Sequence, residues 1–332
     1  MATVNAPSAN IEVDPKVYEN DDSDYGSAGY DTSSTSLSSS VHEYIFENGR
    51  RYHAYFGEDK NLLPTDEKEQ DRMDLHNEIL LRLFDGKLHK SPLKDPQRIL
   101  DVGTGTGIWA IDMADRYPMA EVIGIDLSPI QPSWVPPNCK FTMDDAEKPW
   151  TYADNTFDFI HFRNVAQAIS NWPAVMAEAY RCLKPGGYIE MADTNVDILC
   201  DDGTMKPDNP AKVYCDILNT ALDKIGKPTT REGDIDKLLT NAGLEGLHTF
   251  AVRHPWGPWA KDKRLKEVGV MMLLQGQTAF PSYGLAALTR ILGYDVAKAQ
   301  KICNDGYQAT RNKNTHMYSV HYVGYAQKPL KN

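Results

Sequence analysis

The sequence predicts an α/β fold with a doubly wound, seven-stranded, mostly parallel sheet, an antiparallel C-terminal edge and a helical cap. Between residues 98 and 193, short apolar runs alternate with helical patterns, an order typical of right-handed crossovers with helices on both faces of a sheet. Two later β-rich runs, EGLHTFAVRHPWGP and THMYSVHYVGYAQKP, are separated by helical patterns at about 261–311. We expect these runs to pair as the antiparallel edge, with the intervening helices as the cap.

Each expected element has a local signature. A helix over DEKEQDRMDLHNEILLRLF follows Thr65 as its N-cap and has an acidic first turn. Pro118 stops a second helix, IWAIDMADRY, and a third, WPAVMAEAYRCL, has proline in its first turn. Gly243 ends a short helix in REGDIDKLLTNAGL. The expected parallel strands are RILDVG, EVIGID, KFTM, FDFIHF and GGYIEMAD.

The composition divides the chain into three parts. Residues 1–41 are rich in Ser, Asp and Asn and contain little apolar surface, so a disordered tail is expected. Residues 42–96 form an N-terminal cover segment and helix, in which VHEYIFENGRRYHAYFG is rich in aromatic residues. Residues 97–330 form the main domain, which contains the cap insertion at about 261–311.

Charge and cysteine usage exclude several classes of function. The net charge of −11 opposes binding to nucleic acid and to acidic membrane surfaces. The five cysteines are widely spaced and form no C-x-x-C motif, so we expect neither a metal site nor a disulfide framework. No leader peptide and no apolar run long enough to span a bilayer is evident. We therefore expect a cytoplasmic protein, with the nucleus as the alternative.

A glycine-rich loop follows the first expected parallel strand. Gly103, Gly105 and Gly107 form G-x-G-x-G, and Ile108 occupies the position where a dinucleotide-binding fingerprint requires a small residue. Asp101 stands at the mouth of this loop, where a carboxylate would oppose a pyrophosphate but would suit a positively charged sulfonium or ammonium. The loop therefore predicts a nucleoside ligand without phosphates.

Acidic residues after the next two strands complete this ligand site. Asp126 ends the second strand, where a carboxylate accepts hydrogen bonds from ribose hydroxyls. Asp144 and Asp145 follow the third strand and are expected to accept the adenine amino group, while Ala146 offers a backbone donor. A ribose, an adenine and a cationic tail describe S-adenosyl-L-methionine, which we predict as the cofactor.

Several motifs carry a family resemblance. ILDVGTGTGIW, VIGIDLSPIQPSWVPPN, FTMDDAEKPW, FDFIHFRNV and CLKPGGYIEMAD resemble the class I S-adenosylmethionine-dependent methyltransferases, whose sheet is Rossmann-like. ENGRRYHAY and LPTDEKEQDRMDL resemble the fungal LaeA-like methyltransferases. The resemblance implies that Arg51, Tyr52, His53 and Tyr55 lie over the donor site. The alternative is that this aromatic segment closes the core.

The resemblance also implies a reaction. We expect transfer of a methyl group to O or N of a small molecule in fungal secondary-metabolite biosynthesis. The alternative is a LaeA-like nuclear regulator of secondary metabolism or development that acts through protein partners.

No single catalytic residue is required, because transfer from an activated donor depends mainly on alignment of the acceptor. His161, Arg163 and His53 are the candidates for a base or a substrate clamp. The alternative for His161 is a satisfied sheet histidine. Further polar and aromatic residues are expected at the donor site, in the cap turn or in a pocket wall, namely Glu190, Asp193, His254, Trp256 and Trp259.

Overall fold

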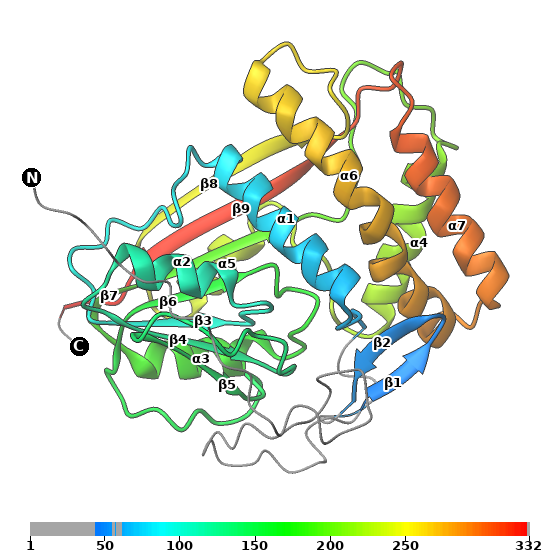
Figure 1. Cartoon of the computed structure of the whole chain (residues 1–332). Helices are drawn as coiled ribbons and strands as arrows, with labels where there is room; N and C mark the ends of the chain where they lie inside the picture. The colour runs from blue at the N-terminus through cyan, green and yellow to red at the C-terminus, as the bar shows by residue number, and fades with distance from the viewer. Residues whose placement is uncertain (1–43, 55–56, 58–61, 331–332) are drawn as a thin grey trace, which may run out of the picture. The chain divides into compact units, whose positions relative to one another are not determined.

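The computed structural model of the chain describes residues 44–54, 57 and 62–330. The segment predicted to be a disordered tail, 1–41, lies outside the described residues. A seven-stranded sheet with the order β5-β4-β3-β6-β7-β9-β8 forms the centre of the described part (Figure 1). Its strands are β3 (Arg98–Val102), β4 (Glu121–Asp126), β5 (Cys139–Met143), β6 (Phe157–Arg163), β7 (Leu183–Thr194), β8 (Glu245–Pro255) and β9 (Tyr318–Gln327).

The sheet confirms the predicted topology. β3, β4, β5, β6 and β7 pair in parallel, whereas β9 pairs antiparallel with both β7 and β8. The two β-rich runs near the C-terminus are therefore the antiparallel edge that the sequence predicts. In this order the carboxyl ends of β4, β3, β6 and β7 meet at one edge of the sheet, which is where ligands bind in parallel α/β folds.

Helices cover both faces of the sheet, so the doubly wound arrangement is also confirmed. Buried residues of α2 (Ile108–Arg116), including Trp109 and Met113, pack against Ile99 and Phe159 on one face. The other face of the sheet, which includes Leu100, belongs to one apolar cluster with buried residues of α3 (Trp172–Cys182) and α5 (Asp234–Asn241), and α5 lies against β8 and β9. The period-two alternation of each strand thus supplies two separate apolar layers.

The cap is larger than predicted. The interval 261–311 contains α6 (Lys263–Ala286), a short π-helix η3 (Ala287–Ile291) and α7 (Val296–Thr310). A further helix, α4 (Pro210–Lys224), was not predicted and packs with them. Among the residues that the structure describes, no helix is long and apolar enough to cross a membrane.

The N-terminal cover consists of a hairpin and a long helix. β1 (Tyr44–Glu47) and β2 (Arg50–His53) pair antiparallel, and α1 (Glu67–Leu83) follows. Figure 1 shows α1 lying between the sheet and the cap helices. The N-cap of α1 is Asp66 rather than the predicted Thr65, because the Asp66 carboxylate accepts the backbone N–H of Glu69 at 3.1 Å, whereas the Thr65 hydroxyl donates to the Arg51 carbonyl.

The backbone at the start of α2 requires glycine. Gly107 is the N-cap, with φ of +81°, and a Cβ there would lie 2.3 Å from the ring of Phe141. Gly226 also has a positive φ, of +70°, but a Cβ there would meet no atom within 4 Å. The two positions therefore separate the cost of a left-handed backbone from the cost of a steric clash.

We expect Gly107→Ala to lower the free energy of unfolding by about 3 kcal/mol, the sum of left-handed strain and overpacking against Phe141. Gly226→Ala, with strain alone, should cost about 1 kcal/mol. Urea denaturation followed by tryptophan fluorescence measures both values. Equal losses for the two variants would show that Phe141 moves aside without cost.

Candidate functional site

A single cavity of about 270 Å³ lies at the carboxyl ends of the parallel strands. One side, which we call the loop half, is formed by loops that follow β3, β4 and β5. The other side, which we call the cap half, is formed by α1, α4, α6 and the end of β8. The loop half includes Gly103, Gly105, Asp126, Asp144, Asp145 and Ala146, and the cap half includes His76, Tyr214, Cys215, Leu218, His254, Trp256, Met272, Gln275 and Phe280.

The glycine loop forms the floor of the loop half. The backbone N–H groups of Gly103 and Thr104 both donate to the Ile125 carbonyl at 2.9 Å, which ties the loop to the end of β4. Gly103 has a φ of +74°, and a Cβ there would lie 2.2 Å from Val165 Cγ1. Gly103 and Gly105 line the cavity, whereas Gly107 lies beneath it as the start of α2.

Asp126 ends β4 and faces the loop half. Its carboxylate accepts the backbone N–H of Gly105 at 2.8 Å and that of Ser128 at 2.9 Å. These two bonds fix the orientation of the side chain and leave further lone pairs for a ligand, because an ionised carboxylate has about four acceptor positions. Burial raises the pKa of Asp126 to about 6, although the two backbone N–H groups oppose the shift.

The acidic pair after β5 lies beside Asp126. Asp144 Oδ1 accepts the backbone N–H of Asp145 at 2.8 Å, and Asp145 Oδ1 accepts that of Glu147 at 3.0 Å. These short-range bonds form a tight turn that presents Asp144, Asp145 and Ala146 to the cavity. The structure therefore brings together most of the residues that the sequence predicted as donor contacts.

Asp193 was expected near the donor or acceptor, and it lines the cavity at the end of β7. Its Oδ2 accepts the backbone N–H groups of Val165 at 3.1 Å and Ala166 at 2.9 Å. Burial raises the pKa of Asp193 to about 7. Because a cavity wall made of loops needs such cross-links, Asp193 holds the loop after β6 in place.

Asp101 does not stand at the mouth of the loop. Its side chain is only 5% exposed, accepts the Thr104 hydroxyl at 2.7 Å and pairs with His161 Nδ1 at 2.8 Å. The reason is the register of the sheet: Asp101 and His161 are direct partners on β3 and β6, and both side chains lie on the α2 face. Neither lines the cavity, so we do not retain Asp101 as a direct ligand contact.

His161 is therefore a satisfied sheet histidine, which was the alternative to a catalytic role. Its ring stacks on Trp109, with 3.7 Å between the ring centroids. Arg163, two residues farther along β6, lines a small separate cavity beside Glu190. Glu190 accepts the backbone N–H groups of Lys90 and Ser91, so it fixes the segment after α1 rather than facing a ligand.

The aromatic hairpin also lies away from the cavity. Tyr52 is buried beneath the Arg290 guanidinium, which lies 4.5 Å from the ring centroid. His53 is buried and packs edge-on against Tyr44, with ring centroids 5.7 Å apart. Neither residue lines the cavity. The structure thus places Tyr52 and His53 in packing roles, which was the alternative to a position over the donor site, whereas Tyr55 lies outside the described residues.

The cap half contains polar residues that the sequence analysis did not single out. His76 and Arg72 come from α1, and Gln275 comes from α6. A signal existed in α1, because Glu69, Arg72 and His76 recur at helical spacing on one side of the helix. His254 and Trp256, expected in a turn or a pocket wall, do line the cavity, whereas Trp259 is partly exposed and donates its indole N–H to the Met317 carbonyl.

Buried ion pairs hold α1 over the cavity. Arg72 donates to Glu69 at 2.7 Å, with both side chains buried. Arg50 donates to Asp66 at 2.6 Å and to the Ser282 hydroxyl of α6 at 3.0 Å. The Arg72–Glu69 pair lies within α1 and neutralises a buried charge there. The Arg50 contacts join the hairpin to the start of α1 and to α6.

The strand order and the antiparallel C-terminal edge are those of the class I S-adenosylmethionine-dependent methyltransferases. A family model described as a methyltransferase domain matches residues 69–249. The chain is 37% identical to methyltransferase pytC of Aspergillus terreus over 99% of both chains. It is 36% identical to secondary metabolism regulator LAE1 of Cochliobolus heterostrophus, over 85% of this chain and 94% of that one. It is 32% identical to protein-methionine methyltransferase laeA of Emericella nidulans, over 89% of this chain and 79% of that one. The chain belongs to the methyltransferase domain family.

The buried pair on α1 generates a stability prediction. Glu69→Gln leaves the Arg72 guanidinium buried without its carboxylate, so we expect the free energy of unfolding to fall by about 3 kcal/mol. Glu67→Gln removes only the exposed partner of Arg51 and should leave the denaturation midpoint almost unchanged. Urea denaturation of both variants measures the difference. A midpoint for Glu69→Gln equal to that of the wild type would show that Glu69 does not neutralise Arg72.

Proposed function

We propose that this methyltransferase transfers a methyl group from S-adenosyl-L-methionine to O or N of a small, predominantly apolar molecule in secondary-metabolite biosynthesis. One observation carries the proposal: a single cavity joins a polar loop half to an apolar cap half. A donor and an acceptor bound in one cavity are held close and aligned, and alignment is the main requirement of an in-line transfer.

The loop half fits the methyl donor. When bound, S-adenosyl-L-methionine supplies a methyl group on a positively charged sulfur. In this proposal the Asp126 carboxylate accepts the ribose hydroxyls through the lone pairs that Gly105 and Ser128 leave open. Asp144 and Asp145 accept the adenine amino group. Gly103, which has no room for a Cβ, lets the backbone approach the ligand closely.

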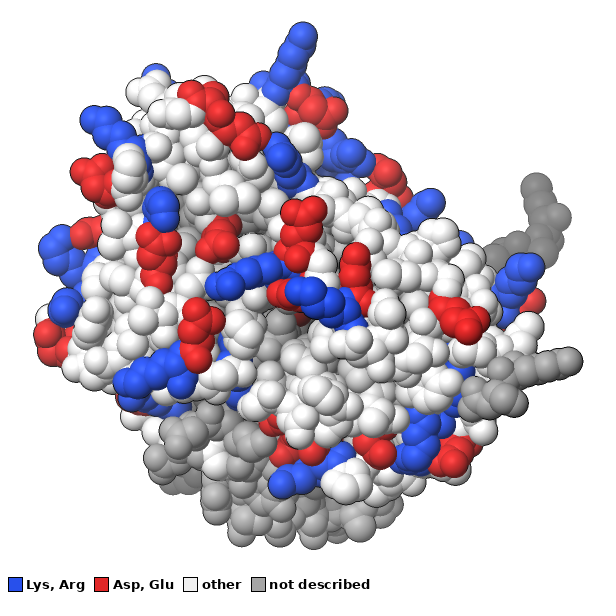
Figure 2. Space-filling view, turned by 180° about the vertical axis from the view of Figure 1, so that it is seen from behind, with Lys and Arg blue, Asp and Glu red and all other residues white. Residues whose placement is uncertain are grey.

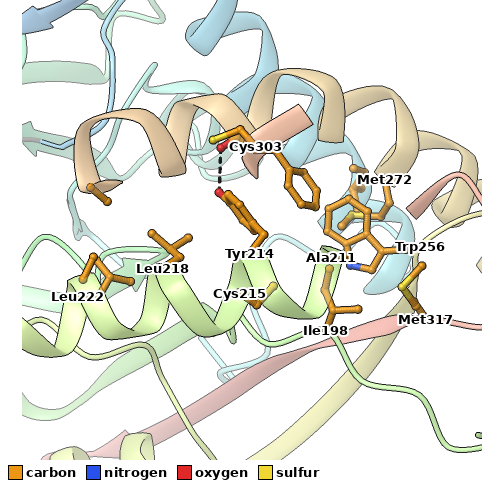
Figure 3. Packing of buried hydrophobic residues seen from close by; sticks show 14 of the residues in the cluster. Ile198, Ala211, Tyr214, Cys215, Leu218, Leu222, Trp256, Met272, Cys303 and Met317 are labelled. Carbon is orange, nitrogen blue, oxygen red and sulfur yellow. Dashed lines mark hydrogen bonds between the residues drawn. The ribbon is translucent and has the colours of Figure 1, made fainter. Parts of the chain in front are cut away.

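The cap half fits an apolar acceptor. Leu218 and Leu222 of α4 line it, and Figure 3 shows Trp256 and Met272 farther along, on the other side of Tyr214 from these leucines. Tyr214 also belongs to this wall, and its hydroxyl donates to the Phe280 carbonyl at 2.8 Å. A wall of aliphatic and aromatic side chains with few polar groups is typical of sites for small organic molecules.

Charge and cysteine usage support the expected partners and compartment. Figure 2 shows Lys and Arg interspersed with Asp and Glu on one face of the described residues, without the basic stripe typical of a nucleic-acid interface. All five cysteines are free, as in proteins of a reducing compartment. We therefore propose a small-molecule acceptor, neither nucleic acid nor membrane as a partner, and a cytoplasmic location, with the nucleus as the alternative.

A second candidate function is regulation through protein partners. Relatives named as a secondary metabolism regulator and as a protein-methionine methyltransferase align over most of this chain. In that case the cap half would receive a side chain of a protein, and the same loop half would bind the donor. The two functions predict different losses when the donor no longer binds: one methylated product for the first, and the output of many pathways for the second.

Metabolite profiles distinguish the two functions. We expect a strain that lacks the gene and a strain that carries Asp126→Ala to accumulate the same single unmethylated intermediate. Liquid chromatography with mass spectrometry of both strains, compared with the parent, measures this. Silencing of many pathways in the deletion strain would support the regulatory function, and normal metabolite levels in the Asp126→Ala strain would contradict a role for donor binding.

The pKa of Asp126 predicts a pH dependence. Only the ionised carboxylate accepts both ribose hydroxyls, and with a pKa of about 6 in the free protein its ionised fraction falls below that pH. We expect the affinity for S-adenosyl-L-methionine to be about ten-fold lower at pH 5 than at pH 7 by isothermal titration calorimetry.

Asp126→Asn is the matched control for this dependence. It should bind the donor about ten-fold more weakly at pH 7 and lose most of the pH dependence, because the amide does not titrate. Asp216→Asn, an exposed residue of α4, should behave as the wild type. If Asp126→Asn kept the full pH dependence, another buried carboxyl such as Asp193 would control donor binding.

A further inference from the structure

The apolar cap half contains buried polar atoms that have no partner within the described protein. Both ring nitrogens of His254 lack a hydrogen bond, although the residue is only 1% exposed. His76 and Gln275 line the same wall, where a side-chain hydrogen bond joins them. An unsatisfied buried polar atom costs about 1–3 kcal/mol, so such atoms in a cavity wall indicate a group that a ligand brings.

These three side chains converge from different elements. His254 lies near the end of β8, where it pairs with Ser319 of β9. His76 belongs to α1 and Gln275 to α6, and all three line the cap half. Since rigid helices and a sheet strand hold them, their positions do not depend on a flexible loop.

The charge of the cap half indicates which polar group an acceptor can carry into it. Burial lowers the pKa of His254 to about 4, and burial together with the nearby Arg72 lowers that of His76, so both imidazoles are neutral near pH 7. Among the described residues that line the cavity, Arg72 is the only Lys or Arg, and Glu69 neutralises it. The cap half therefore offers no free positive charge to an acceptor that carries a carboxylate or a phosphate.

We propose that the cap half binds a neutral, largely apolar acceptor through a hydroxyl group, and that His254 is the residue that recognises this hydroxyl. A neutral imidazole has one ring nitrogen that accepts a hydrogen bond and one that donates, and a hydroxyl both donates and accepts. Trp256, Met272 and Leu218 surround the apolar body of the molecule. This inference rests on the proposed function and specifies the acceptor class of the same site.

Binding of a matched set of probes tests the inference. The probes share one apolar body: 2-naphthol, 2-methoxynaphthalene, which lacks the hydrogen-bond donor, and 2-naphthoate, which carries a charge. Quenching of tryptophan fluorescence or calorimetry measures their dissociation constants with the full chain. We expect 2-naphthol to bind at least about ten-fold more tightly than either of the other two, the difference that one buried hydrogen bond makes.

Variants of His254 link this selectivity to the residue. His254→Leu should reduce the ratio of the 2-methoxynaphthalene and 2-naphthol dissociation constants to near one. It should not lower the thermal midpoint, because it removes unsatisfied buried atoms. His254→Gln, which can still hydrogen-bond, should retain part of the ratio. His248→Leu, an exposed residue on the same strand, is the matched control and should leave the ratio unchanged.

The outcomes separate this inference from the proposed function. Four outcomes would each overturn the inference while leaving donor binding intact. The wild type could bind 2-naphthol and 2-methoxynaphthalene equally, fail to bind 2-naphthol, or bind 2-naphthoate more tightly than 2-naphthol. The fourth outcome is that His254→Leu keeps the full selectivity. If the wild type did not bind S-adenosyl-L-methionine, the proposed function itself would be contradicted. The affinity of His254→Leu for S-adenosyl-L-methionine should stay within two-fold of the wild type.

Discussion

The position of α1 is the constraint on which the cavity depends. Polar contacts attach this helix to each of its neighbours: Arg50 and Asp66 join it to the hairpin, and Asp74 accepts the hydroxyl of Thr106 in the glycine loop at 2.6 Å. Its apolar residues, such as Leu80, belong to the same core cluster as the cap helices. Without α1, the cap half would lose the wall that Arg72, Met73 and His76 form beside the glycine loop.

The loop half could be predicted from sequence because its residues are close together in the chain. Each strand of the parallel sheet ends at the same edge, so Gly103, Asp126 and Asp144 must meet once the strands are recognised. The cap half could not be predicted in the same way. His76 and Gln275 lie on two helices whose only relation is tertiary packing, and the helix α4 that completes the wall was not predicted at all. His254 was expected in a turn or a pocket wall, but nothing in the sequence indicated which residues it would face.

The predictions for Asp101 and His161 failed for a different physical reason. The segments that contain Asp101 and His161 were correctly predicted as strands, but the face to which each side chain points depends on the register and on which helix covers that face. In the structure both point to the α2 face, where they pair with each other. The roles of Tyr52 and His53 could not be predicted for a similar reason. An aromatic hairpin has the same sequence pattern whether it closes a core or covers a ligand.

The two halves of the cavity differ in how far their polar groups are already satisfied. In the loop half, backbone N–H groups fix Asp126, Asp144 and Asp145, so the site is preorganised before a ligand binds. In the cap half, the polar atoms of His254 have no partner within the described protein. A wall of this kind is less stable than an apolar one of the same shape, and only a ligand that supplies the hydrogen bonds offsets the difference. On the proposed function, selectivity for the acceptor resides where the fold itself leaves the polar atoms of His254 unsatisfied.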